Sequence, residues 1–255
     1  MKTKKLKIPS EVGRLASSID YPKNKTKKLA ILCPGFLDSK DYKGLVNLSK
    51  ELCKRDYTVI RFNPIGVWDS DGNISQYNIT QYLKDIKNIL NFMLNQKKYE
   101  NILIGGHSRG GQMAILYAAT DSRISSVLAI MPSVGSIDGP RRIQWKKEGF
   151  CHSERDLPDN PNKKISYQVP FTHVLDRDQY NAYEEVEKIK VPIVLLTGEL
   201  DKIVSSSSVK KIYNNANEPK SFFCIPEIGH DYRFSNKEVE TVNKILLKQM
   251  DSLNI

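Results

Sequence analysis

A serine between two glycines is the residue pattern of this chain with the clearest chemical potential: Gly-His-Ser-Arg-Gly over 106–110. It directly follows an apolar run over 101–105 and precedes an amphipathic segment over 110–120, which predicts a tight turn from a strand into a helix. Glycine is expected on both sides because a side chain there would collide with the neighbouring strand and helix. Ser108 Oγ would then project above a sheet, at a helix N-terminus whose partial positive charge favours a developing oxyanion.

A serine hydroxyl is a poor nucleophile near neutral pH and needs an adjacent base, usually histidine. Of the four histidines, His230 is the best candidate. It follows the last apolar run, at the carboxyl end of a predicted strand, where α/β sheets place their active groups. His107 lies inside the serine turn, and His152 and His173 fall in an irregular stretch. A surface loop histidine is the alternative interpretation of His230.

Two carboxylates follow the preceding predicted strand, in Thr-Gly-Glu-Leu-Asp over 197–201. Asp201 is favoured as the acid because it stands after the tight glycine turn. Glu199 is the alternative on the same loop, where its carboxylate would simply be solvated. The acid would hold His230 in the correct tautomer and stabilise the imidazolium formed on proton transfer. Asp231 is adjacent to the histidine in sequence, which is a poor position from which to receive its ring N–H.

The elements that must position these residues alternate along the chain. Short, nearly continuous apolar runs alternate with longer amphipathic segments, which predicts a mostly parallel central sheet with crossover helices on both faces. Strands are predicted over 29–33, 57–62, 101–105, 127–131, 193–197 and 221–225, and helices over 42–55, 80–97, 110–120, 206–214 and 236–250. Two further segments, 6–8 and 15–19, flank a turn at Gly13 and predict an antiparallel hairpin at one edge of the sheet.

Three motifs occur in order, each after a predicted strand: Gly-His-Ser-Arg-Gly-Gly, then Thr-Gly-Glu-Leu-Asp-Lys-Ile-Val, then Ile-Gly-His. Together they resemble the α/β-hydrolase superfamily, and most closely its small intracellular esterase-like and serine-aminopeptidase-like hydrolases, over nearly the whole chain. The order of nucleophile, acid and base is that of this superfamily. The resemblance implies an α/β-hydrolase fold and a catalytic triad of Ser108, Asp201 and His230. It implies little about the substrate.

Members of that superfamily commonly carry His-Gly-x after an early strand, where a backbone N–H supplies half of the oxyanion hole. This chain has Cys-Pro-Gly-Phe over 33–36 at that place. Because the donor is a backbone group, proline in place of histidine leaves the N–H of Phe36 available, to act together with the N–H of Arg109. A plain turn at the proline and glycine is the alternative.

One segment, 135–178, breaks the alternation of strands and helices. It is rich in Pro, Asn, Asp, Arg and Lys and is too long for a simple loop, so we interpret it as a functional insertion into a core of residues 1–134 and 179–255. Hydrolases of the family that this chain resembles build a cap over the pocket at this place, and the resemblance implies the same role here. The cap would set substrate choice through aromatic side chains for an acyl or aryl group and arginines for a carboxylate or phosphate. The candidates are Trp145, Phe150, Tyr167, Phe171, Arg141 and Arg142. Alternatively, these aromatic residues form the cap's own small core and the arginines face solvent.

Bulk properties argue against several other classes. The 255 residues suit one domain, and no apolar run approaches the roughly 18 residues of a membrane span. The net charge of +10 does not predict nucleic-acid binding, because the lysines are spread along the chain. The four cysteines lack metal-ligand spacing, Asp-Ser-Asp-Gly over 69–72 lacks that of a calcium loop, and no export signal is visible. We therefore expect no metal, no nucleic acid and a cytoplasmic location.

The leading hypothesis is a cofactor-independent serine hydrolase that cleaves a small carboxylic ester through an acyl-enzyme on Ser108. The same triad in a peptidase or amidase would need carboxylates for a free amine. Glu184, Glu185 and Glu187 are candidates, although their spacing is more typical of an exposed helix start. A third hypothesis is a ligand-binding protein that has kept the fold and lost the reaction. A homodimer is compatible with the sequence.

Overall fold

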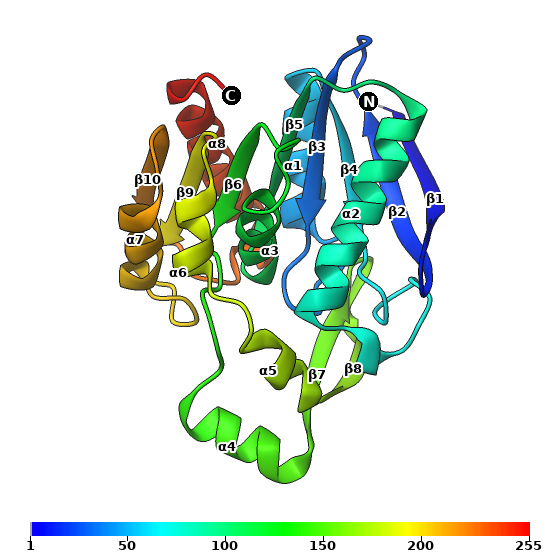
Figure 1. The fold of residues 1–255 in the computed structure, drawn as a ribbon, viewed down its shortest axis with the longest axis vertical. Coiled ribbons are helices and arrows are strands. Elements are labelled where there is room, and N and C mark those ends of the chain that lie inside the picture. The colour runs from blue at the N-terminus through cyan, green and yellow to red at the C-terminus, as the bar shows by residue number, and fades with distance from the viewer. Residues whose placement is uncertain (1) are drawn as a thin grey trace.

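The molecule is built around a sheet of eight strands in a computed structural model that describes residues 2–255. The strands are β1 (Lys2–Ser10), β2 (Gly13–Tyr21), β3 (Lys28–Cys33), β4 (Tyr57–Phe62), β5 (Asn101–His107), β6 (Ser126–Ile130), β9 (Ile193–Gly198) and β10 (Lys220–Ile225). Their order in the sheet is β1-β2-β4-β3-β5-β6-β9-β10 (Figure 1). From β4 to β10 neighbouring strands are parallel, whereas β1 and β2 form an antiparallel hairpin at one edge. Both the parallel core and the edge hairpin lie where the sequence predicts them.

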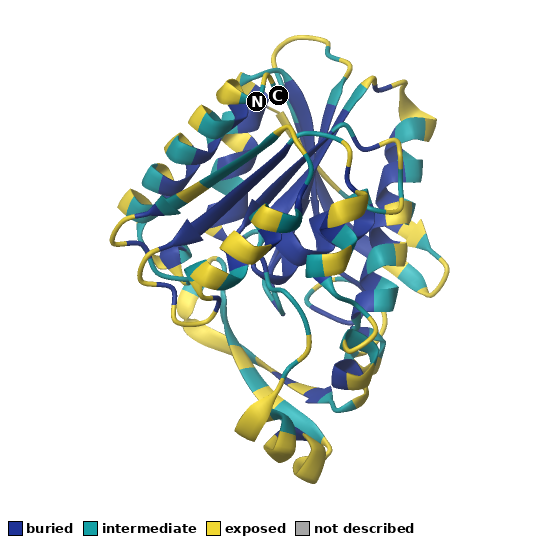
Figure 2. Ribbon diagram, turned by 60° about the vertical axis from the view of Figure 1, so that its left-hand side comes forward, coloured by how far each residue is buried: buried dark blue, intermediate teal, exposed yellow. Residues whose placement is uncertain are grey.

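Helices cover both faces of this sheet. They are α1 (Lys43–Lys54), α2 (Ile79–Gln96), α3 (Arg109–Ala118), α6 (Ala182–Glu185), α7 (Ser206–Asn215) and α8 (Asn236–Ser252). In Figure 1, α2, α3, α6 and α7 lie in front of the sheet and α1 and α8 behind it, and each layer buries its own apolar cluster. Figure 2 shows the central strands buried along nearly their whole length, which explains why they are continuous apolar runs. Within residues 2–255, no helix is long and apolar enough to cross a membrane.

The segment between β6 and β9 contains regular structure, which corrects the expectation of an irregular stretch. It forms α4 (Gly139–Glu148), an antiparallel hairpin of β7 (Phe150–Leu157) and β8 (Asn160–Pro170), and α5 (Thr172–Arg177). The hairpin is mostly polar and partly exposed, so it lacks the apolar run that reveals a buried strand. Figure 1 shows these elements beyond the end of the sheet, outside both helical layers.

Hydrogen bonds fasten this segment to the core. Tyr42 Oη donates to the carbonyl oxygen of Asp156 at 2.8 Å, and the Trp68 N–H donates to Tyr167 Oη at 3.0 Å. The Asp176 carboxylate accepts the first N–H of α2 at 2.8 Å and so caps that helix. The hairpin and α5 are therefore held against the loops that follow β3 and β4 and against the start of α2.

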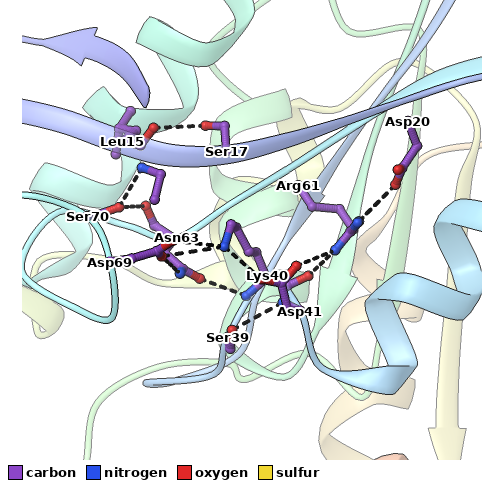
Figure 3. A network of polar contacts seen from close by, with 11 residues as sticks. Leu15, Ser17, Asp20, Ser39, Lys40, Asp41, Arg61, Asn63, Asp69 and Ser70 are labelled. Carbon is purple, nitrogen blue, oxygen red and sulfur yellow. Dashed lines mark hydrogen bonds and ion pairs between the residues drawn. The ribbon is translucent and has the colours of Figure 1, made fainter. Parts of the chain in front are cut away.

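A buried network of charges joins the sheet edge to the loop that follows β3 (Figure 3). Arg61 in β4 donates to Asp20 in β2 through Nε and Nη2, at 3.1 and 3.0 Å, and also to the carbonyl oxygen of Lys40. Lys40 Nζ donates to Asp41 at 2.8 Å, and the side chain of Asn63 accepts the Lys40 N–H at 2.7 Å. Because each charge has a partner, the network can stay buried while it holds this loop against the sheet.

The turn over 69–72, which contains two aspartates, is tied down by cations of the chain itself. Asp69 lies 3.3 Å from Lys40 Nζ. Asp71 accepts from Lys7 Nζ at 2.7 Å and from Arg14 Nε at 2.9 Å. The two aspartates of this polar turn therefore serve as ion-pair partners for lysine and arginine side chains.

We expect Asp20→Ala to lower the free energy of unfolding by about 3–5 kcal/mol, because it leaves the buried Arg61 guanidinium without its main partner. Asp251→Ala is the matched control, since its ion pair with Arg55 is exposed, and we expect a loss below about 1 kcal/mol. Urea unfolding followed by tryptophan fluorescence measures both. Equal losses in the two variants would show that the network contributes no more than a surface pair.

A second prediction concerns Asp85 in α2, which accepts the Ile65 N–H at 2.9 Å. Burial raises the pKa of Asp85 from 3.8 to about 7. Between these values the unfolded chain has released the proton that the folded protein keeps, so stability falls as pH rises through this window. We expect Asp85→Asn to gain stability relative to wild type from about pH 4 to pH 7 and no further above it, measured by urea unfolding at several pH values. Parallel profiles would contradict this.

Candidate active site

Ser108 stands on the sharp turn between β5 and α3. Its backbone is at φ 54° and ψ −118°, a region that side-chain-bearing residues rarely occupy, and such strain collects at functional sites. The Ser108 N–H donates to the Ile130 carbonyl at 2.9 Å, which ties the turn to β6. A Cβ at Gly106 or at Gly110 would run into the carbonyl oxygen of Cys33, the last residue of β3. The turn therefore needs glycine at both positions, as the sequence pattern predicts.

His230, on the loop after β10, connects this serine to a carboxylate. Its Nε2 lies 2.9 Å from Ser108 Oγ and its Nδ1 lies 2.7 Å from Asp201 Oδ2. Because the carboxylate accepts, Nδ1 carries the ring proton and Nε2 is left to accept the serine proton. The arrangement can move a proton from Ser108 to His230, which is what activates a serine nucleophile.

Asp201 is held in place by backbone N–H groups. Its Oδ1 accepts from Ile203 and Val204, each at 2.8 Å, and its side chain is 0% exposed. The competing carboxylates point elsewhere: Glu199 accepts the Glu227 N–H at 3.0 Å, and Asp231 is exposed on the cavity wall. Of the carboxylates considered from the sequence, the structure brings only Asp201 to the histidine ring.

His107 packs beside the triad without joining it. Its ring lies 4.6 Å from the His230 ring, centroid to centroid, and meets Tyr232 edge-on. Burial holds the pKa of His107 well below its usual range, with the nearby His230 and Arg233 acting in the same direction. His107 is thus a neutral packing partner of the His230 ring.

Phe36 and Arg109 both line the cavity beside Ser108. Within residues 2–255, neither backbone N–H donates to another group of the protein, so both are free to bind an oxygen in the cavity. The loop carrying Phe36 is held by its neighbours on three sides. Tyr82 Oη donates to the Pro34 carbonyl, the Leu37 N–H donates to Tyr77 Oη, and Arg155 Nη2 donates to the Phe36 carbonyl, each at 2.9 Å.

The triad opens into a cavity of about 1150 Å³, large enough for a small-molecule substrate. Its walls come from the loops after β3, β5, β6, β9 and β10 on one side and from α4, the β7–β8 hairpin and α5 on the other. Parallel strands end at the same edge of a sheet, which explains why loops distant in sequence meet here. Among residues 2–255, no cluster of three His, Cys, Asp or Glu side chains is arranged to hold a metal ion.

Two of the three substrate-binding candidates lie outside the cavity wall, which corrects their assignment. Trp145 is 2% exposed and donates from Nε1 to the Val169 carbonyl at 2.9 Å, because the amphipathic face of α4 packs it onto the hairpin. Arg142 is absent from the wall and pairs with Asp178 at 2.7 Å. Arg141 does line the cavity. Phe150, Tyr167 and Phe171 are also absent from the wall. Tyr167 and Phe171 pack with the main core cluster, and the Phe150 ring meets the His152 ring edge-on.

Several charged residues of the cavity were not found from the sequence. Asp38 belongs to the same turn as Phe36, and its N–H donates to the Gly35 carbonyl. Burial raises the pKa of its carboxyl, and the nearby Arg233 and Arg155 oppose that rise. Arg233 pairs with Asp156 of β7 at 2.8 Å. Arg177 of α5 also reaches the wall. These residues are far apart in sequence and belong to no local motif, so only the folded chain brings them together.

Comparison with known proteins agrees with this architecture. Residues 29–179 match the family model described as alpha/beta hydrolase fold. The chain therefore belongs to the α/β-hydrolase fold family, and both the predicted fold and the resemblance to that superfamily are confirmed.

Its curated relatives include enzymes named for different activities. A rat palmitoyl-protein thioesterase, ABHD10, named as mitochondrial, is 29% identical over 73% of this chain, and the chain spans 63% of that relative. A polyketide transferase, grgF, from a Penicillium species is 23% identical over 91% of this chain and 90% of its own length. The cytoplasmic location expected for this chain stays a prediction.

Solved structures show the same fold. The crystal structure of GrgF has a TM-score of 0.82 at 17% identity and covers 100% of both chains. Est1E from Butyrivibrio proteoclasticus, with ferulic acid bound, has a TM-score of 0.76 at 19% identity and covers 96% of this chain and 99% of its own. At such identities the likeness establishes the fold alone.

Asp201→Asn tests the role of the carboxylate. The N–H groups of Ile203 and Val204 would keep the amide oxygen, so the amide NH₂ would face His230 Nδ1 and force the proton onto Nε2. That tautomer cannot accept the Ser108 proton. We expect kcat for p-nitrophenyl butyrate hydrolysis to fall by a factor on the order of 10⁴.

Glu199→Gln is the matched control, because this side chain lies on the same loop and contacts only the Glu227 N–H, which glutamine can still satisfy. We expect its kcat to remain near that of wild type. If Asp201→Asn kept most of the wild-type activity, another carboxylate would have to orient His230.

Proposed function

We propose that this protein is a serine hydrolase that cleaves a small carboxylic ester through an acyl-enzyme on Ser108, with His230 as general base and Asp201 as its orienting acid. The observation that carries the proposal is the continuous hydrogen-bonded chain from Ser108 Oγ through His230 to Asp201, at 2.9 and 2.7 Å, on a strained strand-to-helix turn. A binding module would have no chemical reason to hold all three groups in this geometry.

In the proposed reaction, Ser108 Oγ attacks the substrate carbonyl carbon while its proton passes to His230 Nε2. The carbonyl oxygen becomes an oxyanion that accepts the N–H groups of Phe36 and Arg109. His230 then returns the proton to the leaving group as the intermediate collapses to the acyl-enzyme. Water, activated by the same histidine, releases the acid and regenerates Ser108. The residues in hand supply each of these steps.

Oxygen esters and thioesters both fit this chemistry, because each presents an acyl carbonyl with a leaving group that His230 can protonate. The rat relative is named a thioesterase, which supports this substrate range over an amide. The peptidase alternative is less well supported. Glu184 bonds Asn181, Glu185 pairs with Lys188, and neither these carboxylates nor Glu187 lies in the cavity wall.

A fluorophosphonate probe tests the nucleophile, because it forms a covalent bond only with an activated serine. We expect the wild type to label and to hydrolyse p-nitrophenyl esters, and Ser108→Ala to lose both, with kcat lower by a factor on the order of 10⁶. Labelling is measured by gel fluorescence and hydrolysis by p-nitrophenol release.

Ser207→Ala is the matched control, since Ser207 is exposed on α7 and does not line the cavity. We expect it to label and turn over as wild type does. A wild type that neither labels nor turns over would refute the hydrolase proposal and favour the non-catalytic, ligand-binding hypothesis.

A further inference from the structure

The charged side chains of the cavity fall into two groups. Toward the β7–β8 hairpin and η3 (Tyr232–Phe234), acids and bases are paired within the wall itself. The pairs are Arg233 with Asp156 at 2.8 Å, Lys164 with Glu154 at 2.9 Å, and Arg155 with Asp38 at 3.6 Å. These contacts leave that side of the cavity close to electrically balanced.

The side formed by α3, α4 and α5 is different. Arg109, Arg141 and Arg177 each line the cavity there. Among residues 2–255, no carboxylate oxygen lies within 4.0 Å of a nitrogen of these three guanidinium groups, so none of them forms an ion pair. The neighbouring carboxylates are engaged elsewhere: Asp176 caps α2, and Asp178 pairs with Arg142.

Arg109 is the most deeply placed of the three. It is 2% exposed, and its Nε is buried without a hydrogen-bond partner in the described chain. Its Nη1 lies 3.3 Å from His173 Nε2. His173 Nδ1 lies 2.8 Å from the Tyr77 carbonyl oxygen, which can only accept, so Nδ1 carries the proton and Nε2 is a neutral acceptor. Burial, together with Arg109, lowers the pKa of His173 to about 3, so it brings no second charge.

The three guanidinium groups are also oriented by their surroundings. Arg109 Cζ lies 5.6 Å from the Phe36 ring centroid, and Arg141 Cζ lies 5.9 Å from that of Trp145. Arg177 donates through Nε to the Gly135 carbonyl, which leaves its terminal nitrogens for the cavity. Burial and the charges of Arg109 and Arg141 push the pKa of Arg177 well below its usual range, so the cations repel one another.

Of the three arginines, Arg109 is buried, Arg177 is half-buried and Arg141 is exposed. Buried cations of one sign are unfavourable unless an anion compensates them, and Arg141 adds a further positive charge to the same wall. The cavity therefore holds three guanidinium groups without a compensating carboxylate. A negatively charged group on the substrate would supply that compensation. Guanidinium forks match the planar oxygens of a carboxylate and the tetrahedral oxygens of a phosphate, and both can accept from two arginines at once.

We propose that Arg109, Arg141 and Arg177 bind a second anionic group of the substrate, a carboxylate or a phosphate, distinct from the ester or thioester that is cleaved. The protein then prefers acyl substrates that carry this charge over neutral ones of the same length. This inference rests on the proposed function for the scissile bond and deepens it by naming the substrate class.

Two matched substrate pairs locate the charge. p-Nitrophenyl hydrogen adipate against p-nitrophenyl hexanoate tests a carboxylate on the acyl chain. Hexanoyl-coenzyme A against the hexanoyl thioester of N-acetylcysteamine tests phosphates on the leaving group. We expect wild-type kcat/KM to favour the anionic member of one pair, and Arg177→Gln to lower kcat/KM for that member by roughly 10- to 100-fold with little change for its neutral partner.

Arg141→Gln should act in the same direction and carries little folding risk, because Arg141 is exposed. Arg142→Gln is the matched control: the adjacent arginine of α4 lies outside the wall, and its substitution should leave the preference unchanged. Equal kcat/KM within both pairs, or a preference that survives Arg141→Gln and Arg177→Gln, would overturn the inference.

Calorimetric titration separates this inference from the hydrolase proposal. Adipate and inorganic phosphate are compared with neutral adipamide, and no turnover is needed. Should the protein neither label with fluorophosphonate nor turn over, the hydrolase proposal fails, but tighter binding of either anion that weakens roughly 10- to 100-fold in Arg177→Gln and not in Arg142→Gln would still support the anion site. Anions that bind no tighter than adipamide would refute it.

Discussion

The close approach of the β5–α3 turn to the end of β3 is the constraint on which the rest of the site depends. Gly106 and Gly110 lie against the Cys33 carbonyl, so no side chain fits at either position, and Ser108 between them is held in a strained conformation. Because Cys33 pairs with Gly106 across neighbouring parallel strands, the residues after β3 are delivered beside the serine. Phe36 and Arg109 thus line the same cavity from two separate segments.

The segment between β6 and β9 contacts the residues around the serine. Arg155 of β7 donates to the Phe36 carbonyl at 2.9 Å, and Asp156 pairs with Arg233 of the loop that also carries His230. The hairpin therefore contacts both the proposed oxyanion donor and the neighbourhood of the proposed base. Its contribution to the cavity is mostly polar, whereas its Tyr167 packs in the core. The resulting wall is balanced in charge on the hairpin side and positive on the side of α3, α4 and α5.

The central strands, which local patterns predicted, are almost uniformly buried. The apolar runs at 57–62 and 193–197 are strands because helices cover both faces of the sheet, and the bounds expected for them agree closely with β4 and β9. The β7–β8 hairpin escaped prediction because it is half exposed and polar, with neither a continuous nor an alternating apolar signal. Trp145 was wrongly assigned to the substrate site for a related reason. The sequence of an amphipathic helix does not distinguish an aromatic residue that packs against its neighbours from one that binds a ligand.

By itself, the sequence determined the parallel sheet, the strained serine turn and the identity of the residues at the ends of successive strands, because each depends on local periodicity and on glycine at two positions. The choice of Asp201 over Glu199 was favoured by spacing and became definite only when backbone N–H groups and His230 Nδ1 were seen to share its two oxygens. The cluster of Arg109, Arg141 and Arg177 was decided by tertiary structure alone. These arginines lie on three different helices, and charge compensation depends on distances in space that no sequence pattern records.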